Sequence, residues 1–262
     1  MIGFPHSKIL INPELVSAMP ETLFDYGSHR AEGKYAKAGR GTIVRFQHQN
    51  QPLILKTYKR GGLPGCFIRE SYFYNGIENT RMWQEFRLLQ ALHRLGLPVP
   101  RPVAARCVMM TPLTYRGELI MEEIAESKTL VDVLAEQPLS PEAWSRIGRL
   151  IAEFHHHGVY HGDLNASNIL LSKDGSLYLI DFDKSAIRNS CPVQAKDWQA
   201  SNLWRLQRSL LKFARRLESL HFNNDGWQVL MQGYIKARQR LGETAFACII
   251  MEDFIPLLSA VM

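Results

Sequence analysis

A polar loop and an acidic segment flank a short predicted hairpin in the second half of the chain. The loop reads HGDLNASN at residues 161–168, and LIDFD follows at residues 179–183. The apolar runs between them are separated by the turn-forming sequence SKDG, which is typical of two antiparallel strands joined by a tight turn. A hairpin places its two outer ends side by side. The sequence therefore predicts a short hairpin between the polar loop and the acidic segment.

The spacing within this region resembles the catalytic loop of the protein-kinase superfamily. His161, Asp163 and Asn168 fill the pattern H-x-D-x-x-x-x-N, and Asp181 stands thirteen residues further on. The form HGD, in place of HRD, is similar to the small-molecule and lipopolysaccharide-kinase branches. An Asx-rich turn between two strands is the alternative, because Asp and Asn favour turns. The full pattern followed by IDFD is much more specific than HGD alone.

The resemblance implies an α+β, bilobal protein-kinase-like fold and a phosphotransferase that uses ATP and Mg²⁺. Phosphoryl transfer depends on positioning and charge neutralisation more than on covalent chemistry. On the resemblance, Asp163 is the catalytic residue, which accepts or orients the proton of the acceptor hydroxyl. Asn168 and Asp181 hold Mg²⁺ through oxygen atoms, and His161 braces the loop by hydrogen bonding.

The first half of the chain is predicted to be rich in strands. The segments TIVRF and LILKTY flank the turn-prone QHQNQP, which is typical of a hairpin. A helix is expected from Thr80 to Leu95, ended by Gly96. The remaining predicted strands are Ala104–Met110 and Glu118–Ile124.

The second half is predicted to be mainly helical. Ser140 followed by Pro141 is a strong helix start, and Gly158 is expected to end that helix. The predicted buried faces are Trp144, Ile147, Ile151 and Phe154 on this helix, and Leu203, Leu206, Leu210, Phe213 and Leu217 on a later helix from Lys196 to Leu220. We expect an ATP-binding lobe at residues 1–123, and a lobe at 124–262 that carries the catalytic loop, the metal site and the acceptor site.

A lysine in the first half is the candidate ligand of the nucleotide phosphates. Lys56 lies inside the apolar run LILK, behind the glycine pair Gly39 and Gly41. Glycines let backbone N–H groups approach phosphate oxygens without a Cβ clash. An exposed strand lysine and a simple glycine turn are the alternatives.

Glu85 is the predicted ion-pair partner of Lys56. On the expected helix it shares a face with Leu88, Leu92 and Leu95, and an acid on an apolar stripe needs a buried cation or a satisfying network. A solvated glutamate, or Glu70 or Glu78 in its place, is the alternative. The segment GELIMEEIAES resembles the hinge between kinase lobes, whose backbone would bind adenine near Glu122 to Ile124.

Composition limits the class of protein and of partner. The 262 residues are 46% hydrophobic and 21% charged, which excludes disorder. The four cysteines show no metal-ligand spacing, and no signal peptide or apolar stretch of 18 residues is visible. We therefore expect a protein that is cytoplasmic, or peripheral on the cytoplasmic side of a membrane. The net charge of +6 favours an acidic partner.

Two basic regions are candidate acceptor sites. The first contains Lys59, Arg60 and Arg69 beside an aromatic-rich stretch. The second lies on the late helix, where Arg205 and Arg208 begin a stripe continued by Lys212 and Arg215. Most such stripes are solvated faces, but basic groups next to apolar ones also suit anionic lipid headgroups. No nucleic-acid-binding module is visible.

The segments around the motifs resemble the 3-deoxy-D-manno-octulosonic acid (Kdo) kinases of the lipopolysaccharide kinase family, over roughly residues 30 to 240. They are YKRGG, EFRLLQALHRLGLPVPRPVAA, LIDFDKS and the basic late helix. The resemblance implies phosphorylation of the 4-hydroxyl of the Kdo sugar on Kdo-lipid IVA. The implied setting is the cytoplasmic face of a Gram-negative inner membrane, with the protein bound peripherally.

One departure from the superfamily concerns the acidic segment. DFG is replaced by Asp181-Phe182-Asp183, and no APE motif follows, which favours a small-molecule or glycolipid acceptor over a protein. The alternatives are a heptose kinase of the same family, an aminoglycoside-type phosphotransferase and a lipid-binding pseudokinase. The basic balance argues against the second. Retention of four residues argues against the third: Lys56, Asp163, Asn168 and Asp181.

Overall fold

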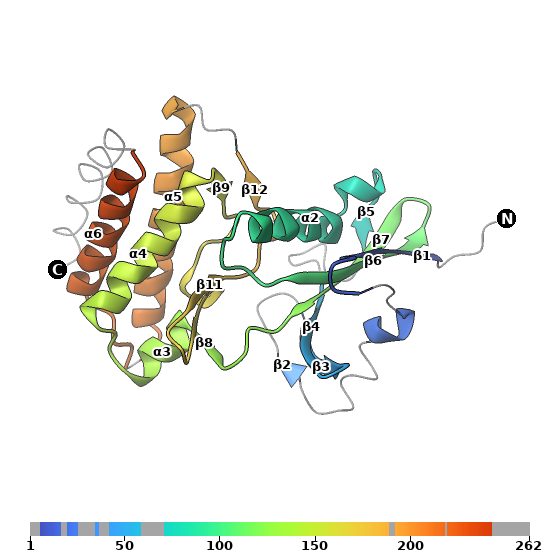
Figure 1. The fold of residues 1–262 in the computed structure, drawn as a ribbon, viewed down its shortest axis with the longest axis horizontal. Helices are drawn as coiled ribbons and strands as arrows, with labels where there is room; N and C mark the ends of the chain where they lie inside the picture. Colours follow the sequence, from blue (N-terminus) through green and yellow to red (C-terminus); the bar gives the residue numbers. More distant parts are fainter. Residues whose placement is uncertain are drawn as a thin grey trace. The chain divides into compact units, whose positions relative to one another are not determined.

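The computed structural model (Figure 1) describes residues 6–16, 20–25, 35–36, 42–58, 71–188, 192–217 and 219–242. The chain divides into two units, Met1–Ala125 and Glu126–Met262, called unit 1 and unit 2 below. The expected lobe boundary followed residue 123. The functions assigned to the two lobes stay predictions.

The described part of unit 1 is built on a seven-stranded antiparallel sheet. The strand order is β1-β6-β7-β4-β3-β2, and β5 pairs with β7. The helix α2 (Arg81–Arg94) packs against β6 and β7. The strands are β1 (His6–Ile11), β2 (Tyr35–Ala36), β3 (Thr42–His48), β4 (Gln51–Thr57), β5 (Tyr72–Phe73), β6 (Pro102–Thr111) and β7 (Thr114–Glu122), and the 3-10 helices are η1 (Glu21–Phe24) and η3 (Ile77–Asn79).

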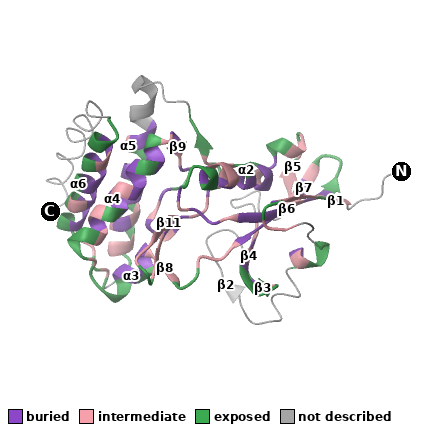
Figure 2. Ribbon diagram, viewed as in Figure 1, coloured by how far each residue is buried: buried purple, intermediate pink, exposed green. Residues whose placement is uncertain are grey.

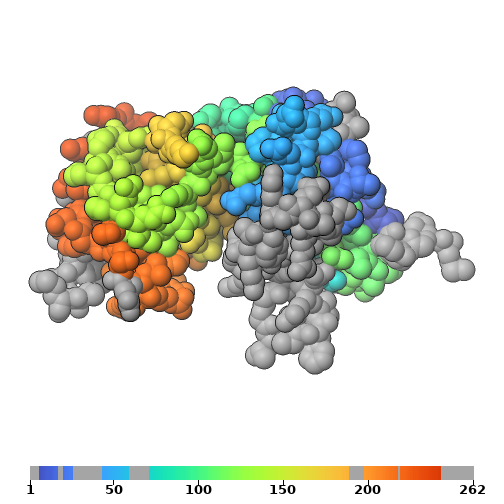
Figure 3. All heavy atoms as spheres, turned by 90° about the horizontal axis from the view of Figure 1, so that it is seen from below, coloured from blue at the N-terminus to red at the C-terminus, as the bar shows by residue number. Residues whose placement is uncertain are grey.

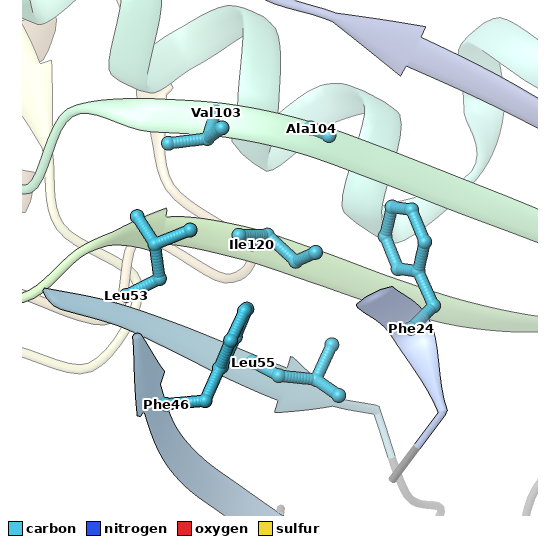
Figure 4. Packing of buried hydrophobic residues seen from close by; sticks show 7 residues of the cluster. All are labelled: Phe24, Phe46, Leu53, Leu55, Val103, Ala104 and Ile120. Carbon is cyan, nitrogen blue, oxygen red and sulfur yellow. The ribbon is translucent and has the colours of Figure 1, made fainter. Parts of the chain in front are cut away.

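The predicted hairpin of β3 and β4 is confirmed. Its two turn residues, Gln49 and Asn50, have φ angles of 48° and 62°, as a two-residue turn between twisted strands requires. Alternate side chains of these strands enter a buried apolar cluster with β6, β7 and η1 (Figure 4). The cluster consists of Phe24, Phe46, Leu53, Leu55, Val103, Ala104 and Ile120.

Unit 2 is mainly helical among the residues described. Its largest packing is between α4 and α6, which are neighbours in Figure 1 and on the surface drawn in Figure 3 (yellow-green and red). A Cβ atom on Gly148 of α4 would lie 2.0 Å from the carbonyl oxygen of Leu230, so the two helices approach closely there. The elements are α3 (Leu130–Glu136), α4 (Pro141–His156), α5 (Pro192–Ala214), α6 (Asn224–Arg240), β8 (Ser127–Thr129), β9 (Val159–Tyr160), η4 (Ala166–Asn168), β10 (Ile169–Ser172), β11 (Leu177–Leu179) and β12 (Ala186–Ile187).

The start of α4 is as predicted. Ser140 is its N-cap and accepts a hydrogen bond from the N–H of Ala143, with proline at the first helical position. All four predicted core residues of α4 are buried (purple in Figure 2). The prediction for α5 was partly wrong: the helix begins at Pro192 and ends at Ala214, so the exposed Leu217 lies beyond it and is not part of its core stripe. None of the helices in the described ranges is long and apolar enough to cross a bilayer.

Candidate active site

The loop at residues 161–168 is held in one conformation by its own asparagines. Asn165 caps η4, and its Oδ1 atom accepts a hydrogen bond from the N–H of Ser167 at 2.8 Å. The Nδ2 atom of Asn168 donates to the carbonyl oxygen of Asp163 at 2.9 Å. Because that amide nitrogen is used inside the loop, the carboxamide oxygen of Asn168 is the atom that can bind a cation.

His161 joins this loop to the end of the hairpin. Its Nδ1 atom accepts a hydrogen bond from the N–H of Asp163 at 3.1 Å, so the ring proton lies on Nε2. Nε2 then donates to the carbonyl oxygen of Ile180 at 3.0 Å. The imidazole is buried. The prediction that His161 braces the loop by hydrogen bonding is confirmed.

The hairpin of β10 and β11 brings Asp181 to the loop. The two strands pair from Ile169 opposite Leu179 onward, and the N–H of Ile180 donates to the carbonyl oxygen of Asn168 at 3.0 Å. Asp181 follows with φ of 63°, in the left-handed region that Asp tolerates better than most residues. The predicted hairpin is therefore present, and it brings the polar loop and the acidic segment together.

Phe182 anchors the acidic segment in the core of unit 2. Its ring stacks on Phe154 of α4, with centroids 5.9 Å apart, and lies 4.8 Å from the ring of His161. The aromatic residue between the two aspartates thus fixes the backbone on both sides of it. Asp181 and Asp183 are each partly exposed.

The middle residue of HGD has no room for a side chain in this structure. A Cβ atom on Gly162 would lie 2.7 Å from the carbonyl oxygen of Asp183 and 2.8 Å from that of Lys184. The N–H of Gly162 also donates to Oγ of Ser185 at 2.9 Å. The turn after the acidic segment therefore crosses directly over Gly162, where no side chain fits.

The helix α5 supplies supports that the sequence analysis missed. The buried side chain of Asn202 accepts from the N–H of His161 at 3.1 Å and donates to its carbonyl oxygen at 3.0 Å. Ser209 accepts from the N–H of Ala166 at 2.9 Å. The available signal was two polar residues beside a leucine stripe, because a buried polar side chain needs a partner.

A second buried polar group lies behind Asn202. His155 of α4 is fully enclosed, and its Nδ1 atom is 2.9 Å from the hydroxyl of Tyr234. Burial, with the nearby positive charge of Arg238, lowers the pKa of His155 to about 3. A hydrogen bond to Asn202 acts in the opposite direction on this pKa. His155 is therefore a neutral structural histidine at the back of the loop.

The carboxylate of Asp163 is the exposed part of the loop. Its side chain is 60% exposed, and the Nη1 atom of Arg205 on α5 lies 3.8 Å from its Oδ1 atom. The Nε atom of Arg205 is buried and makes no hydrogen bond. Arg208, one turn further, is exposed and stacks over Trp204 at 4.6 Å. The predicted basic stripe thus begins beside Asp163.

The leucines of α5 are not available to a lipid. Leu203, Leu206 and Leu210 are all buried inside unit 2. The leucine side of this amphipathic helix is used in the core, and its described solvent-facing residues include Trp204 at 45% exposure beside the basic Arg208. Whether this basic stripe contacts anionic lipid headgroups stays a prediction.

In unit 1, Lys56 and Glu85 form the predicted ion pair. The Nζ atom of Lys56 lies 2.7 and 2.8 Å from the two carboxylate oxygens of Glu85, and both side chains are largely buried. The hydroxyl of Tyr58 donates to the same carboxylate, and the Lys56 ammonium lies 5.0 Å from the Tyr58 ring centroid. Tyr58 was missed by the sequence analysis. Glu78, one of the alternatives, pairs with Arg87 instead.

The buried face of α2 differs from the one predicted. Leu92 is buried, but Leu88 is only half-buried, and Leu95 is exposed and lies after the last helical residue. Glu85 is nevertheless on the core side, among Met82, Trp83, Phe86 and Leu89.

Comparison with known proteins identifies the relatives of this chain. The model of the lipopolysaccharide kinase (Kdo/WaaP) family matches residues 31–234. The chain belongs to this family. A 3-deoxy-D-manno-octulosonic acid kinase of Photobacterium profundum is 40% identical over 88% of the chain and 96% of the relative. One of Vibrio cholerae is 43% identical over 66% of the chain and 72% of the relative.

A solved structure of WaaP in complex with acyl carrier protein shows the same fold. It superposes with a TM-score of 0.55 at 17% sequence identity, and covers 96% of this chain and 99% of that one. The predicted α+β, kinase-like fold class is confirmed for this lipopolysaccharide kinase.

The stretch of the lipopolysaccharide kinase that was expected to bind adenine ends β7. The N–H of Glu122 donates to the carbonyl oxygen of Arg101, and the N–H of Glu123 donates to that of Pro52, both at 2.9 Å. These two donors are used within unit 1. Adenine could therefore bind only to the remaining backbone groups between Glu122 and Ile124. This contact stays a prediction.

Some of the predicted site residues lie outside the part of the chain that the structure describes. Gly39, Gly41, Lys59, Arg60 and Arg69 lie outside the described residues. Within the described ranges, no three His, Cys, Asp or Glu residues form a metal-binding group. The carboxamide oxygen of Asn168 and the carboxylate of Asp181 fit Mg²⁺, which is usually bound by one or two protein ligands together with phosphates and water.

Proposed function

We propose that this lipopolysaccharide kinase transfers the γ-phosphoryl group of ATP to the 4-hydroxyl of the Kdo sugar of Kdo-lipid IVA. Support for the acceptor comes from relatives at 37–43% identity that carry the name 3-deoxy-D-manno-octulosonic acid kinase. Support for the chemistry comes from one observation in unit 2: the exposed carboxylate of Asp163 stands on a backbone that His161 and Asn168 fix.

Asp163 is the proposed catalytic residue. Its carboxylate accepts or orients the proton of the acceptor hydroxyl, which then attacks the γ-phosphorus in line with the leaving oxygen. The hydrogen bond from its N–H to His161 holds the backbone while the side chain stays open to an acceptor. This arrangement favours positioning, which supplies much of the rate enhancement in phosphoryl transfer.

Each unit, taken separately, has residues that we propose to contact the nucleotide. Lys56 binds phosphate oxygens, and Glu85 and Tyr58 keep its ammonium in place. Asn168 and Asp181 hold Mg²⁺, which when bound neutralises charge on the phosphates. Backbone groups at Gly39 and Gly41, and between Glu122 and Ile124, are the further ATP contacts proposed in unit 1.

Arg205 and Arg208 are the described candidates for binding the acceptor. The guanidinium of Arg205 lies next to the Asp163 carboxylate, where it can bind the carboxylate of a Kdo sugar whose hydroxyl reaches Asp163. We propose that the phosphates of the lipid bind to Lys59, Arg60 and Arg69. The implied location is the cytoplasmic face of the inner membrane, where the protein would be peripheral, and no nucleic-acid partner is proposed.

In the test, purified protein is incubated with labelled ATP, Mg²⁺ and one of three acceptors. The acceptors are Kdo-lipid IVA, a heptosylated core and an aminoglycoside. We expect label on the Kdo sugar of the first. Label only on the second or the third would replace the proposed acceptor with that of a heptose kinase or of an aminoglycoside-type enzyme.

The variant Asp163→Asn should lose transfer at least 10³-fold, in the range of general-base contributions, and still bind Mg²⁺-ATP in calorimetry. Asp174→Asn is the matched control, because Asp174 is an exposed turn residue of the same unit. Turnover of Asp163→Asn at the rate of this control would remove Asp163 from the mechanism.

A further inference from the structure

The hairpin of β6 and β7 ends in an exposed apolar turn. Leu113 in the turn is 61% exposed, and Met110 just before it is 36% exposed. The short strand β5 adds Phe73, which is 66% exposed and pairs with Thr114 at the start of β7. These three side chains, called the apolar tip below, come from two segments that lie side by side in Figure 1.

The neighbouring segments are firmly attached to each other. The N–H of Tyr74 donates to the carbonyl oxygen of Leu113 at 2.8 Å. The rings of Tyr72 and Tyr115 are 5.6 Å apart, and the hydroxyl of Tyr115 accepts from the N–H of Arg81 at 3.1 Å. The apolar tip therefore stands on an ordered base.

A second hairpin of the same sheet shows that the apolar tip is not required by the fold. The turn of β3 and β4 consists of Gln49 and Asn50, both polar and exposed. Surface turns favour such residues. In unit 1, the exposed large apolar residues among those described are Leu95 and the three of the apolar tip. Three of four thus gather at one end of one sheet, which marks an interaction surface.

The segments that form the apolar tip and pair beside it are basic. The segments 6–8, 71–77 and 106–116 contain no Asp or Glu. They contribute the exposed Lys8, the half-buried Arg116 and Arg106, while Arg81 donates a hydrogen bond to the hydroxyl of Tyr72 at 2.7 Å. The acids next to these segments are engaged: Glu118 pairs with Arg106, Glu78 pairs with Arg87, and Glu21 accepts a hydrogen bond from Ser7. Exposed apolar side chains, with Tyr72 and Arg81 next to them, suit the boundary between acyl chains and anionic headgroups.

We propose that the apolar tip inserts into the surface of a bilayer that contains anionic phospholipids. A convex turn fits the soft headgroup layer, whereas a protein partner of such a turn must supply a groove. The reason for docking rests on the proposed function, since a kinase of a lipid-linked sugar works at a membrane. The binding itself requires neither ATP nor acceptor, so it is measured independently.

The test is flotation of the full chain with vesicles of phosphatidylethanolamine and phosphatidylglycerol, and with vesicles of phosphatidylcholine alone. We expect binding to the anionic vesicles, weaker in high salt. Phe73→Ser and Leu113→Ser should each lower the partition coefficient about tenfold or more, because burying a Phe or Leu side chain contributes more than one factor of ten. Leu95→Ser is the matched control: Leu95 is 46% exposed in the same unit but lies at the end of α2, and its variant should bind as the wild type does.

Three results would overturn the proposal. They are no binding of the wild type to anionic vesicles, equal binding of the apolar-tip and Leu95 variants, and a wild-type dimer in gel filtration that Leu113→Ser dissociates. Activity separates this proposal from the proposed function. The apolar-tip variants should keep their kcat/KM on a deacylated Kdo acceptor and lose efficiency only on acceptor embedded in vesicles. Vesicle binding without any Kdo kinase activity would leave the docking surface standing and refute the proposed function.

Discussion

The variant Gly162→Ala tests whether the position of the loop backbone affects catalysis when all the side chains of the site are kept. Gly162→Ala adds a Cβ atom 2.7 and 2.8 Å from the carbonyl oxygens of Asp183 and Lys184. Both are backbone atoms, so no side chain can turn away to make room. The turn after Asp181 must retreat from the loop by about 0.5 Å, and overpacking of this kind costs about 1–3 kcal/mol.

The displacement acts on the proposed metal ligand rather than on Asp163. A misplacement of about 1 Å lowers rates about 10²-fold, so we expect kcat to fall about tenfold and the KM for ATP to rise. The melting temperature should drop by about 2–12 °C, since 1 kcal/mol corresponds to about 2–4 °C in a protein of this size.

The assay combines transfer of labelled phosphate, titrated with Mg²⁺, and thermal unfolding. Gly117→Ala is the control: the three atoms nearest to its new Cβ all belong to the side chain of Met82, in unit 1, and Met adapts readily. It should leave kcat and the magnesium dependence unchanged. The reasoning fails if Gly162→Ala keeps the wild-type kcat and magnesium dependence, whatever its stability.

Two further predictions concern buried groups. Glu85→Gln removes the negative charge that lies 2.7 Å from the Lys56 ammonium, so kcat/KM for ATP should fall at least tenfold. The control Glu78→Gln, in an exposed ion pair, should change kcat/KM less than twofold. Equal effects of the two variants would contradict the role of the buried pair. His155 has its pKa lowered to about 3 by burial, so the unfolded state takes up the proton first, and stability is full above about pH 6.5 and declines below it. The loss at pH 5 is about 2 kcal/mol, measured by urea unfolding; His155→Gln should flatten this dependence, and an unchanged slope would assign the effect elsewhere.

Local sequence was sufficient for the loop and for the ion pair. The spacing of Asp163 and Asn168 is set by the loop itself, and the hairpin that follows is closed by its own turn, so both are short-range properties. Glu85 was predictable because an acid on the apolar side of a helix needs a cation. The assignment of Leu95 to that side failed because the helix ends at Arg94 and Gly96 turns the chain away with φ of 75°.

Contacts between distant segments could not be predicted. The strand β1 pairs with β6, about a hundred residues later in the chain, and its short sequence carries no strong alternation. Asn202 and Ser209 reach the loop only because α5 crosses behind it. Their identities are unremarkable in a single sequence, since polar residues on helices are ordinarily solvated.

The hydrogen bond from the N–H of Ile180 to the carbonyl oxygen of Asn168 closes the open end of the hairpin of residues 168–180. The pairing of β10 with β11 and this bond hold the two proposed metal ligands at one end of the hairpin. The turn at 173–176 lies at the other end. The turn can therefore lengthen, or accept an inserted peptide, while the carboxamide of Asn168 and the carboxylate of Asp181 keep their separation. A reporter group placed there would follow the enzyme without touching its chemistry.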